Sequence, residues 1–181
     1  MKKQQNKLIG INATCFSNRP SGAKNRFIGF FQHIFNVNQD LNFIVYMPTD
    51  CRLEKHFSKN QNVTFKRTPL KSTNPLQRFI FGLFYWYFEL RRMNFDIFES
   101  FNLPLVKNPL GMTLLTIHDV RHIRAFSWFR FIKFIIHQRA IRQADRVITV
   151  SNSMRSEILE IFPETKITVI YNGINQSIKK Y

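Results

Sequence analysis

The sequence predicts an α/β fold with a doubly wound, mostly parallel sheet of about seven strands. Short runs rich in β-branched residues alternate with helical patterns, which is typical of βαβ units and a parallel sheet. The 181 residues, 44% hydrophobic and 21% charged, suffice for one globular domain with a proper core. Two late apolar runs end in polar residues, at His118-Asp119 and Ser151. Open parallel sheets place their chemistry at that edge.

Strands are expected where short apolar runs stand between turn signals. The run 8–13 is the predicted first, central strand, and the turn-rich loop 14–22 follows it. The other predicted strands are 42–47, 63–67, 96–99, 112–117, 146–150 and 166–170.

Helices are expected where apolar residues recur at helical spacing or where capping signals stand. The helix 23–36 carries a phenylalanine-rich stripe, and Asn74-Pro75 starts a helix that runs to Met93. Ser151 or Ser153 caps a helix that Pro163 stops. The remaining predicted helical segments are one or two turns at 52–57 and a helix at 127–144.

Three sequence blocks carry a family resemblance. They are Thr116-Ile-His-Asp119, then Ala144-Asp-Arg-Val-Ile-Thr-Val-Ser151, and finally Asn172-Gly-Ile174. In this order and spacing they resemble the N-terminal domain of the retaining glycosyltransferases of family 4. The resemblance implies the Rossmann-like, acceptor-binding half of a GT-B fold. It also implies hexose transfer from a nucleotide sugar to a glycan or lipid-linked acceptor, in bacterial surface polysaccharide synthesis.

By this resemblance, His118 reaches the donor sugar from the acceptor side of the cleft, and Asp119 orients the loop or the acceptor. The alternative for His118 is a histidine that only hydrogen-bonds a loop. His118 and His122 also form a His-x-x-x-His pair, but a zinc pair at that spacing needs one helix under both residues. His118 ends a strand, so we expect no metal and no cofactor besides the donor substrate.

The first loop is a predicted phosphate site. Ser21 and Gly22 precede a helix N-terminus, whose backbone amides can receive a phosphate, and Lys24 and Arg26 add positive charge. The alternative for both cations is an ordinary solvated helix face. Family members often have two glycines here, whereas this chain has Gly22 alone, which leaves close backbone approach in doubt at the other position.

Two further groups follow from the resemblance. Ser151, Asn152 and Ser153 are expected on the acceptor side of the cleft or in support of the residues there. Asn172 and Gly173 form the expected hinge, although Asn175 stands where the family has an aspartate.

A net charge of +16 favours an anionic partner, although part of it fits the Lys- and Asn-rich usage of an AT-rich genome. Two aromatic and basic helices suggest an anionic membrane surface. The contact candidates on the second of them are Trp128, Arg130, Lys133, Arg139 and Arg142. For the first of these helices, the alternative is that its apolar segment 79–88 is buried on all sides. A basic RNA- or membrane-binding module without catalysis is the rival function, but no RNA-binding motif supports nucleic acid as a partner.

The expected domain organisation is one Rossmann-like domain over residues 1–174, with 175–181 beginning a linker. Family resemblance places the donor site mainly on a C-terminal domain, with two glutamates eight positions apart. The closest pair here, Glu157 and Glu164, is seven apart and precedes the hinge. We therefore expect the donor domain to be absent and residues 1–181 alone to be inactive. Isolated cysteines and no signal peptide or spanning run favour a cytoplasmic location, peripheral on the inner face of the membrane.

Overall fold

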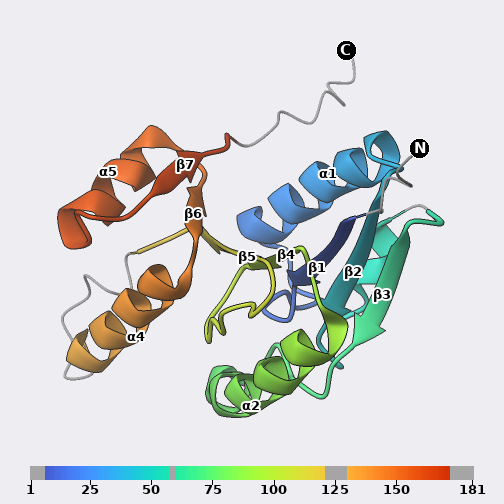
Figure 1. The fold of residues 1–181 in the computed structure, drawn as a ribbon, viewed down its shortest axis with the longest axis horizontal. Helices are drawn as coiled ribbons and strands as arrows, with labels where there is room; N and C mark the ends of the chain where they lie inside the picture. The colour runs from blue at the N-terminus through green and yellow to red at the C-terminus, as the bar shows by residue number, and fades with distance from the viewer. Residues whose placement is uncertain (1–6, 58–59, 121–129, 172–181) are drawn as a thin grey trace.

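The computed structural model describes residues 7–57, 60–120 and 130–171. Seven strands form one sheet in the order β3-β2-β1-β4-β5-β6-β7, and every neighbouring pair is parallel (Figure 1). The strands are β1 (Lys7–Asn12), β2 (Leu41–Met47), β3 (Val63–Arg67), β4 (Ile97–Ser100), β5 (Met112–Ile117), β6 (Arg146–Thr149) and β7 (Ile167–Val169). This arrangement confirms the predicted doubly wound α/β fold.

Four α-helices flank the sheet in the described part of the chain. They are α1 (Gly22–Val37), α2 (Pro75–Met93), α4 (Arg130–Gln143) and α5 (Asn152–Ile161), with a short 3₁₀ turn at Leu53–His56. Side-chain oxygens of Ser21, Asn74 and Ser151 accept hydrogen bonds from backbone N–H groups three residues on, which satisfies donors that a helix start leaves free. Ser151 therefore caps α5, as one of the two predicted alternatives held.

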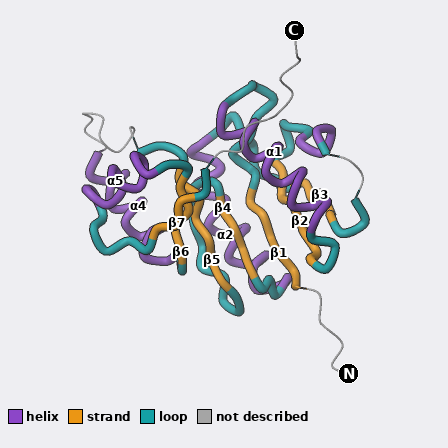
Figure 2. The backbone as a smooth tube through the Cα atoms, turned by 90° about the horizontal axis from the view of Figure 1, so that it is seen from above, coloured by secondary structure: helices purple, strands orange, loops and turns teal. Residues whose placement is uncertain are grey.

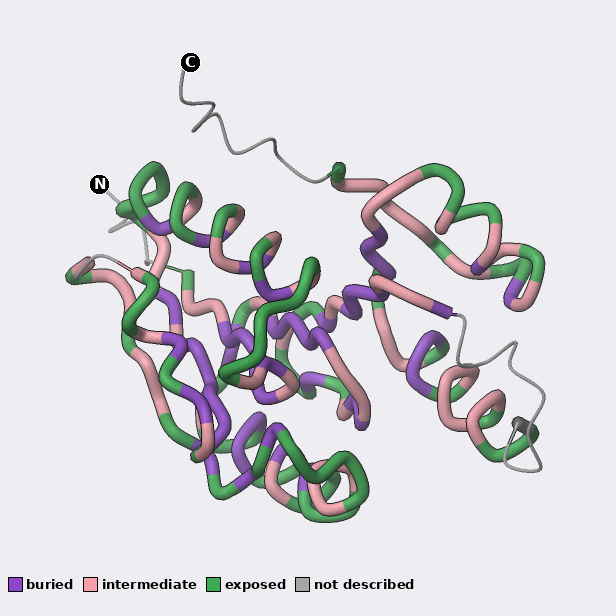
Figure 3. Tube along the Cα trace, turned by 180° about the vertical axis from the view of Figure 1, so that it is seen from behind, coloured by how far each residue is buried: buried purple, intermediate pink, exposed green. Residues whose placement is uncertain are grey.

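Helices cover both faces of the sheet. Successive side chains of a strand point to opposite faces, so one strand can contribute apolar residues to both. Along β2, Phe43, Val45 and Met47 join the cluster under α1, whereas Tyr46 lies in the cluster under α2. A third cluster joins α4 and α5 to β5 and β6. Figure 2 shows α4 and α5 beside β6 and β7, and Figure 3 shows the buried residues concentrated along the strands and the inner sides of the helices. The core thus consists of three apolar clusters, one under α1, one under α2 and one under α4 and α5.

Helix α2 packs on the sheet by one side only. Gly82, Trp86, Glu89 and Leu90 are buried, and a Cβ at Gly82 would lie 3.1 Å from the Pro104 ring. The opposite side exposes seven large apolar side chains, so the alternative of burial on all sides is wrong. These are Leu76, Ile80, Phe81, Leu83, Phe84, Tyr87 and Phe88. Across residues 7–57, 60–120 and 130–171, no helix has the length and apolarity to span a bilayer.

The strand order reverses direction between β1 and β4. The chain builds β1, β2 and β3 outward in one direction and then crosses back to place β4 on the other side of β1. Such a reversal opens a crevice beyond the carboxyl ends of the two central strands, where open α/β sheets bind ligands. The candidate site therefore lies at the ends of β1, β4 and β5.

Candidate functional site

Asn12 and Ser100 join the ends of β1 and β4 at the reversal point. The Asn12 amide donates to the Ser100 hydroxyl at 2.9 Å, and the Asn12 side-chain oxygen accepts from the Thr14 hydroxyl at 2.7 Å. All three residues are buried. Because the Thr14 backbone N–H also donates to Asn12, this network fixes where the first loop leaves the sheet.

His118 follows the last residue of β5 at the same edge. Its ring stacks on Phe101, with centroids 5.9 Å apart and planes inclined by 17°. Its Nε2 atom is buried and has no hydrogen-bond partner among the described residues. Burial, and secondarily the charge of Arg26, lower the pKa of His118 from 6.5 to about 4, so the imidazole is neutral at pH 7.

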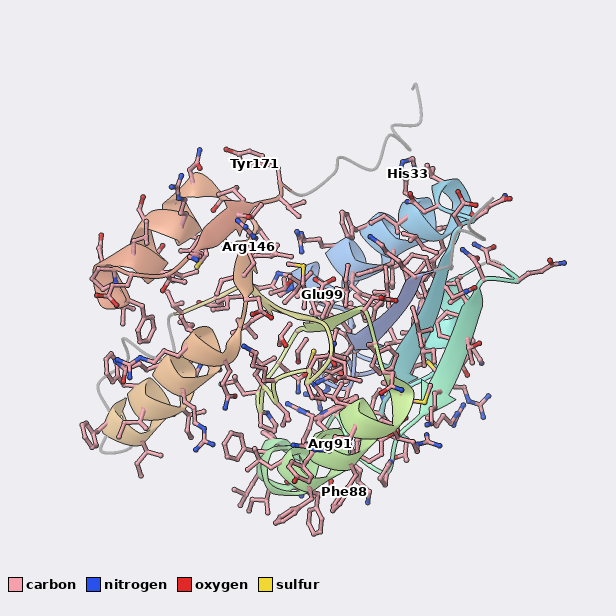
Figure 4. All side chains as sticks on the ribbon, in the orientation of Figure 1. His33, Phe88, Arg91, Glu99, Arg146 and Tyr171 are labelled. Carbon is pink, nitrogen blue, oxygen red and sulfur yellow. The ribbon has the colours of Figure 1, made fainter. Side chains whose placement is uncertain are left out.

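Glu99, near the end of β4, is a buried carboxyl group that the sequence prediction missed. It is 9% exposed, and its Oε1 atom accepts a hydrogen bond from the Thr116 hydroxyl at 2.6 Å. Burial raises the pKa of Glu99 to about 7, while the Thr116 bond and the charge of Arg26 act in the opposite direction. Figure 4 shows Glu99 between α1 and the central strands. A lone acid in the apolar strand Ile97–Ser100 was the available signal.

Arg26 brings a permanent positive charge from α1 toward these two residues. One of its terminal nitrogens donates to the Ile170 carbonyl at 2.9 Å, just after β7. Its Nε atom is buried and has no partner in the described part of the chain. Burial lowers the pKa of Arg26, and the nearby charge of Glu99 opposes that effect. Arg26 therefore does not lie on a purely solvated helix face, which was the alternative for this residue.

Together these groups form a polar centre within an apolar surround. A neutral imidazole can exchange hydrogen bonds with hydroxyl groups, because one ring nitrogen donates and the other accepts. A guanidinium group suits phosphate or carboxylate oxygens. A carboxyl group with a pKa near 7 can hold or release a proton at physiological pH. The arrangement thus fits recognition of a hydroxyl-rich or anionic ligand.

Two of the other residues predicted in the first loop, Gly22 and Lys24, line an open groove beside α1, whereas Ser21 caps that helix. The groove has a volume of about 1770 Å³, and its lining includes Gly22, Lys24 and Arg26 as well as Tyr171. A Cβ at Gly22 would meet nothing within 4 Å, so the surface there is open to a ligand. Lys24 is 5% exposed, and its ammonium group donates to the Ser17 carbonyl at 2.9 Å. Its charge therefore serves chiefly to hold the loop.

The three residues predicted at the start of α5, which are 151–153, make different contacts. Ser151 is committed to the helix cap, and Ser153 is exposed. The Asn152 amide donates to the Tyr171 hydroxyl at 2.8 Å, and Figure 4 shows Tyr171 projecting from the segment after β7. The hinge residues Asn172 and Gly173 lie outside the described residues. Asp119 is half-buried directly after His118.

The predicted membrane-contact residues on α4 are only partly covered by the structure. Trp128 and the Arg130 side chain lie outside the described part. Lys133 is half-buried, whereas Arg139 and Arg142 are exposed. Exposed apolar residues on the same helix are Phe131, Ile132 and Ile135.

Replacing Glu99 with glutamine should change how stability depends on pH. Between pH 4.5 and 7 the folded protein keeps a proton that the unfolded chain has released, so the free energy of unfolding falls as pH rises. The rise of the Glu99 pKa from 4.5 to about 7 on folding lowers the free energy of unfolding by about 3 kcal/mol above pH 7. Glutamine keeps an oxygen for Thr116 and does not ionise. We therefore expect Glu99→Gln to exceed the parent in stability at pH 8 and to match it near pH 4.

Denaturant unfolding at both pH values measures this effect, with Glu164→Gln as the matched exposed control. An equal stability difference at pH 4 and pH 8 would contradict an ionising buried carboxyl group at position 99.

No curated protein matches this sequence. Among solved structures, a glucose-6-phosphate dehydrogenase in complex with glucose-6-phosphate is similar over 88% of this chain, at 11% identity and a TM-score of 0.39. This chain spans 40% of that protein, and a likeness at this level carries no functional argument. Residues 37–177, well over half of the sequence, match the model of Glycosyltransferase Family 4. The chain therefore belongs to glycosyltransferase family 4.

Proposed function

We propose that this domain is the acceptor-side half of a retaining GT-B hexosyltransferase. The observation that carries the proposal is the convergence of Arg26, Glu99 and His118 at the carboxyl edge of the central strands, in a chain of the glycosyltransferase family. The three residues come from α1, β4 and the end of β5. A hydroxyl-rich sugar has the chemistry that such a set of donors and acceptors recognises.

Each residue has a distinct part in this proposal. The neutral His118 hydrogen-bonds a hydroxyl of the transferred sugar, and its lack of charge avoids repelling the positive charge that develops at the sugar's anomeric carbon. Arg26 holds an anionic oxygen near the reacting groups. Glu99 accepts a hydrogen bond from an acceptor hydroxyl or keeps Arg26 in place. Preorganised polar groups of this kind act most strongly where water is excluded.

The substrates are part of the same proposal. The donor is a nucleotide sugar, bound chiefly by a second Rossmann-like domain, and the reaction needs no metal or other cofactor. The acceptor is a glycan or a lipid-linked saccharide in bacterial surface polysaccharide synthesis. A net charge of +16 supports a cytoplasmic protein that binds peripherally to an anionic membrane surface.

Sugar transfer by a form that carries both domains tests this proposal. The assay offers radiolabelled UDP- and GDP-hexoses with an extract of lipid-linked saccharides, and it measures label in the product. The anomeric configuration of the product, read by NMR, tests retention. An inverted product would contradict the retaining mechanism, and no transfer from any of these donors would contradict a hexosyltransferase.

A further inference from the structure

The outer side of α2 is an apolar surface that nothing in the described structure covers. The seven side chains listed above are 40–69% exposed, and Phe84 and Phe88 exceed 60%. On a helix they occupy the arc opposite Gly82, Trp86 and Leu90, which face the sheet. Soluble monomers rarely expose a contiguous apolar surface of this kind without a partner.

The exposed charges of α2 itself have one sign. The only acid of α2 is Glu89, which is buried and accepts hydrogen bonds from Tyr46, Lys66 and Arg92. Arg91 and Arg92 stand exposed at the C-terminal end. The Arg91 guanidinium lies 3.6 Å from the centre of the Tyr87 ring, and Figure 4 shows Arg91 and Phe88 on the outer side of the helix. The surface therefore combines exposed aromatic groups with cations and no exposed acid.

We infer that the outer side of α2 inserts into the interface of an anionic lipid bilayer. Apolar side chains enter the boundary between headgroups and acyl chains, while flanking arginines remain at the level of the lipid phosphates. A second copy of this chain fits the surface less well, because each copy carries +16 and brings Arg91 and Arg92 to the contact. The inference rests on the membrane contact proposed above and not on sugar transfer.

The main membrane contact then lies on α2 and not on the α4 residues that the sequence predicted. Helix α4 exposes three large apolar side chains, against seven on α2. Both helices lie in the lower half of the molecule in Figure 1, α4 at one side and α2 at the bottom. The aromatic side of α2 provides most of the insertion.

Vesicle co-sedimentation tests the inference on the full-length protein. The vesicles contain phosphatidylcholine alone or phosphatidylcholine with 30% phosphatidylglycerol. We expect partitioning onto the anionic vesicles at low salt, and at least a tenfold weaker partition coefficient for the triple variant Phe81→Ser, Phe84→Ser, Phe88→Ser. These side chains are exposed, so the fold should persist, which circular dichroism checks. The matched control on α4, Phe131→Ser with Ile135→Ser, should change partitioning by less than about threefold.

Two charge measurements complete the test. Arg91→Gln should weaken binding to anionic vesicles more than binding to neutral ones, and 0.5 M salt should release much of the protein. Equal partitioning of the α2 triple variant and the parent would overturn the inference. So would a loss of dimer mass in the variant without any change in vesicle binding, because a second copy would then be the occupant. The triple variant is also assayed for sugar transfer to a soluble acceptor. If it still transfers sugar, the proposed function stands whatever the vesicle result.

Discussion

Replacing His118 with alanine in a form that carries both domains is expected to lower turnover by about 10²-fold or more. That size is typical of losing one preorganised polar contact in an active site. The physical reason is the position of Nε2, which is buried at the carboxyl edge and has no partner among the described residues. Such an atom has an unused hydrogen-bonding position that a sugar hydroxyl would fill. The measurement is the initial rate of sugar transfer at saturating donor and acceptor.

His33→Ala is the matched control, because His33 is exposed on α1 away from the central strands (Figure 4). The control should retain its rate within about twofold. Near-ultraviolet circular dichroism verifies that the His118 variant keeps its fold after losing the stack on Phe101. A rate for His118→Ala within twofold of the parent would assign His118 a structural role only.

The largest expected effect on stability comes from Gly111→Ala. A Cβ at this position would lie 2.3 Å from the backbone oxygens of both Phe95 and Asp96. Backbone atoms cannot rotate aside as a side chain can, and the Asp96 carbonyl also accepts a hydrogen bond from the Met112 N–H at 2.8 Å. The start of β5 would have to separate from β4. We expect a loss of about 3 kcal/mol or more in the free energy of unfolding.

Gly29→Ala provides the opposite result within the same protein. Gly29 lies inside α1, and an added Cβ would meet nothing within 4 Å. Alanine favours a helix interior by about 1 kcal/mol over glycine, so this variant should be slightly more stable than the parent. Urea titrations of both variants measure the two changes in the free energy of unfolding. A Gly111→Ala protein as stable as the parent would show that β4 and β5 are not paired as described.

The strands and helix starts could be predicted because local signals determine them. Asn74-Pro75 sets the start of α2 through a cap and a preset backbone angle, and the structure places both there. The outer side of α2 could not be predicted in this way. Ten consecutive apolar residues in 79–88 have no period that separates a packed side from an exposed one.

The polar centre depends on contacts that no local pattern contains. Glu99 meets Thr116 because β4 pairs with β5 in a register where Glu99 lies opposite Leu114. Arg26 reaches the carbonyl of Ile170, which is 144 positions away in the sequence. The sequence patterns indicated His118 and the neighbourhood of Arg26 through strand ends and loop composition. Whether these predicted residues act in catalysis stays a prediction.

The position of β1 inside the sheet, between β2 and β4, has a consequence for synthesis on the ribosome. Its partner on one side, β4, is hydrogen-bonded through Asn12 and Ser100, which are 88 residues apart. At about 5–20 residues per second, β1 waits roughly 4–18 s for that partner to be translated. During this time one side of an apolar strand has free backbone donors and acceptors, which is a template for pairing with another chain. Nascent chains of this domain should therefore depend on chaperones most strongly before residue 100 emerges.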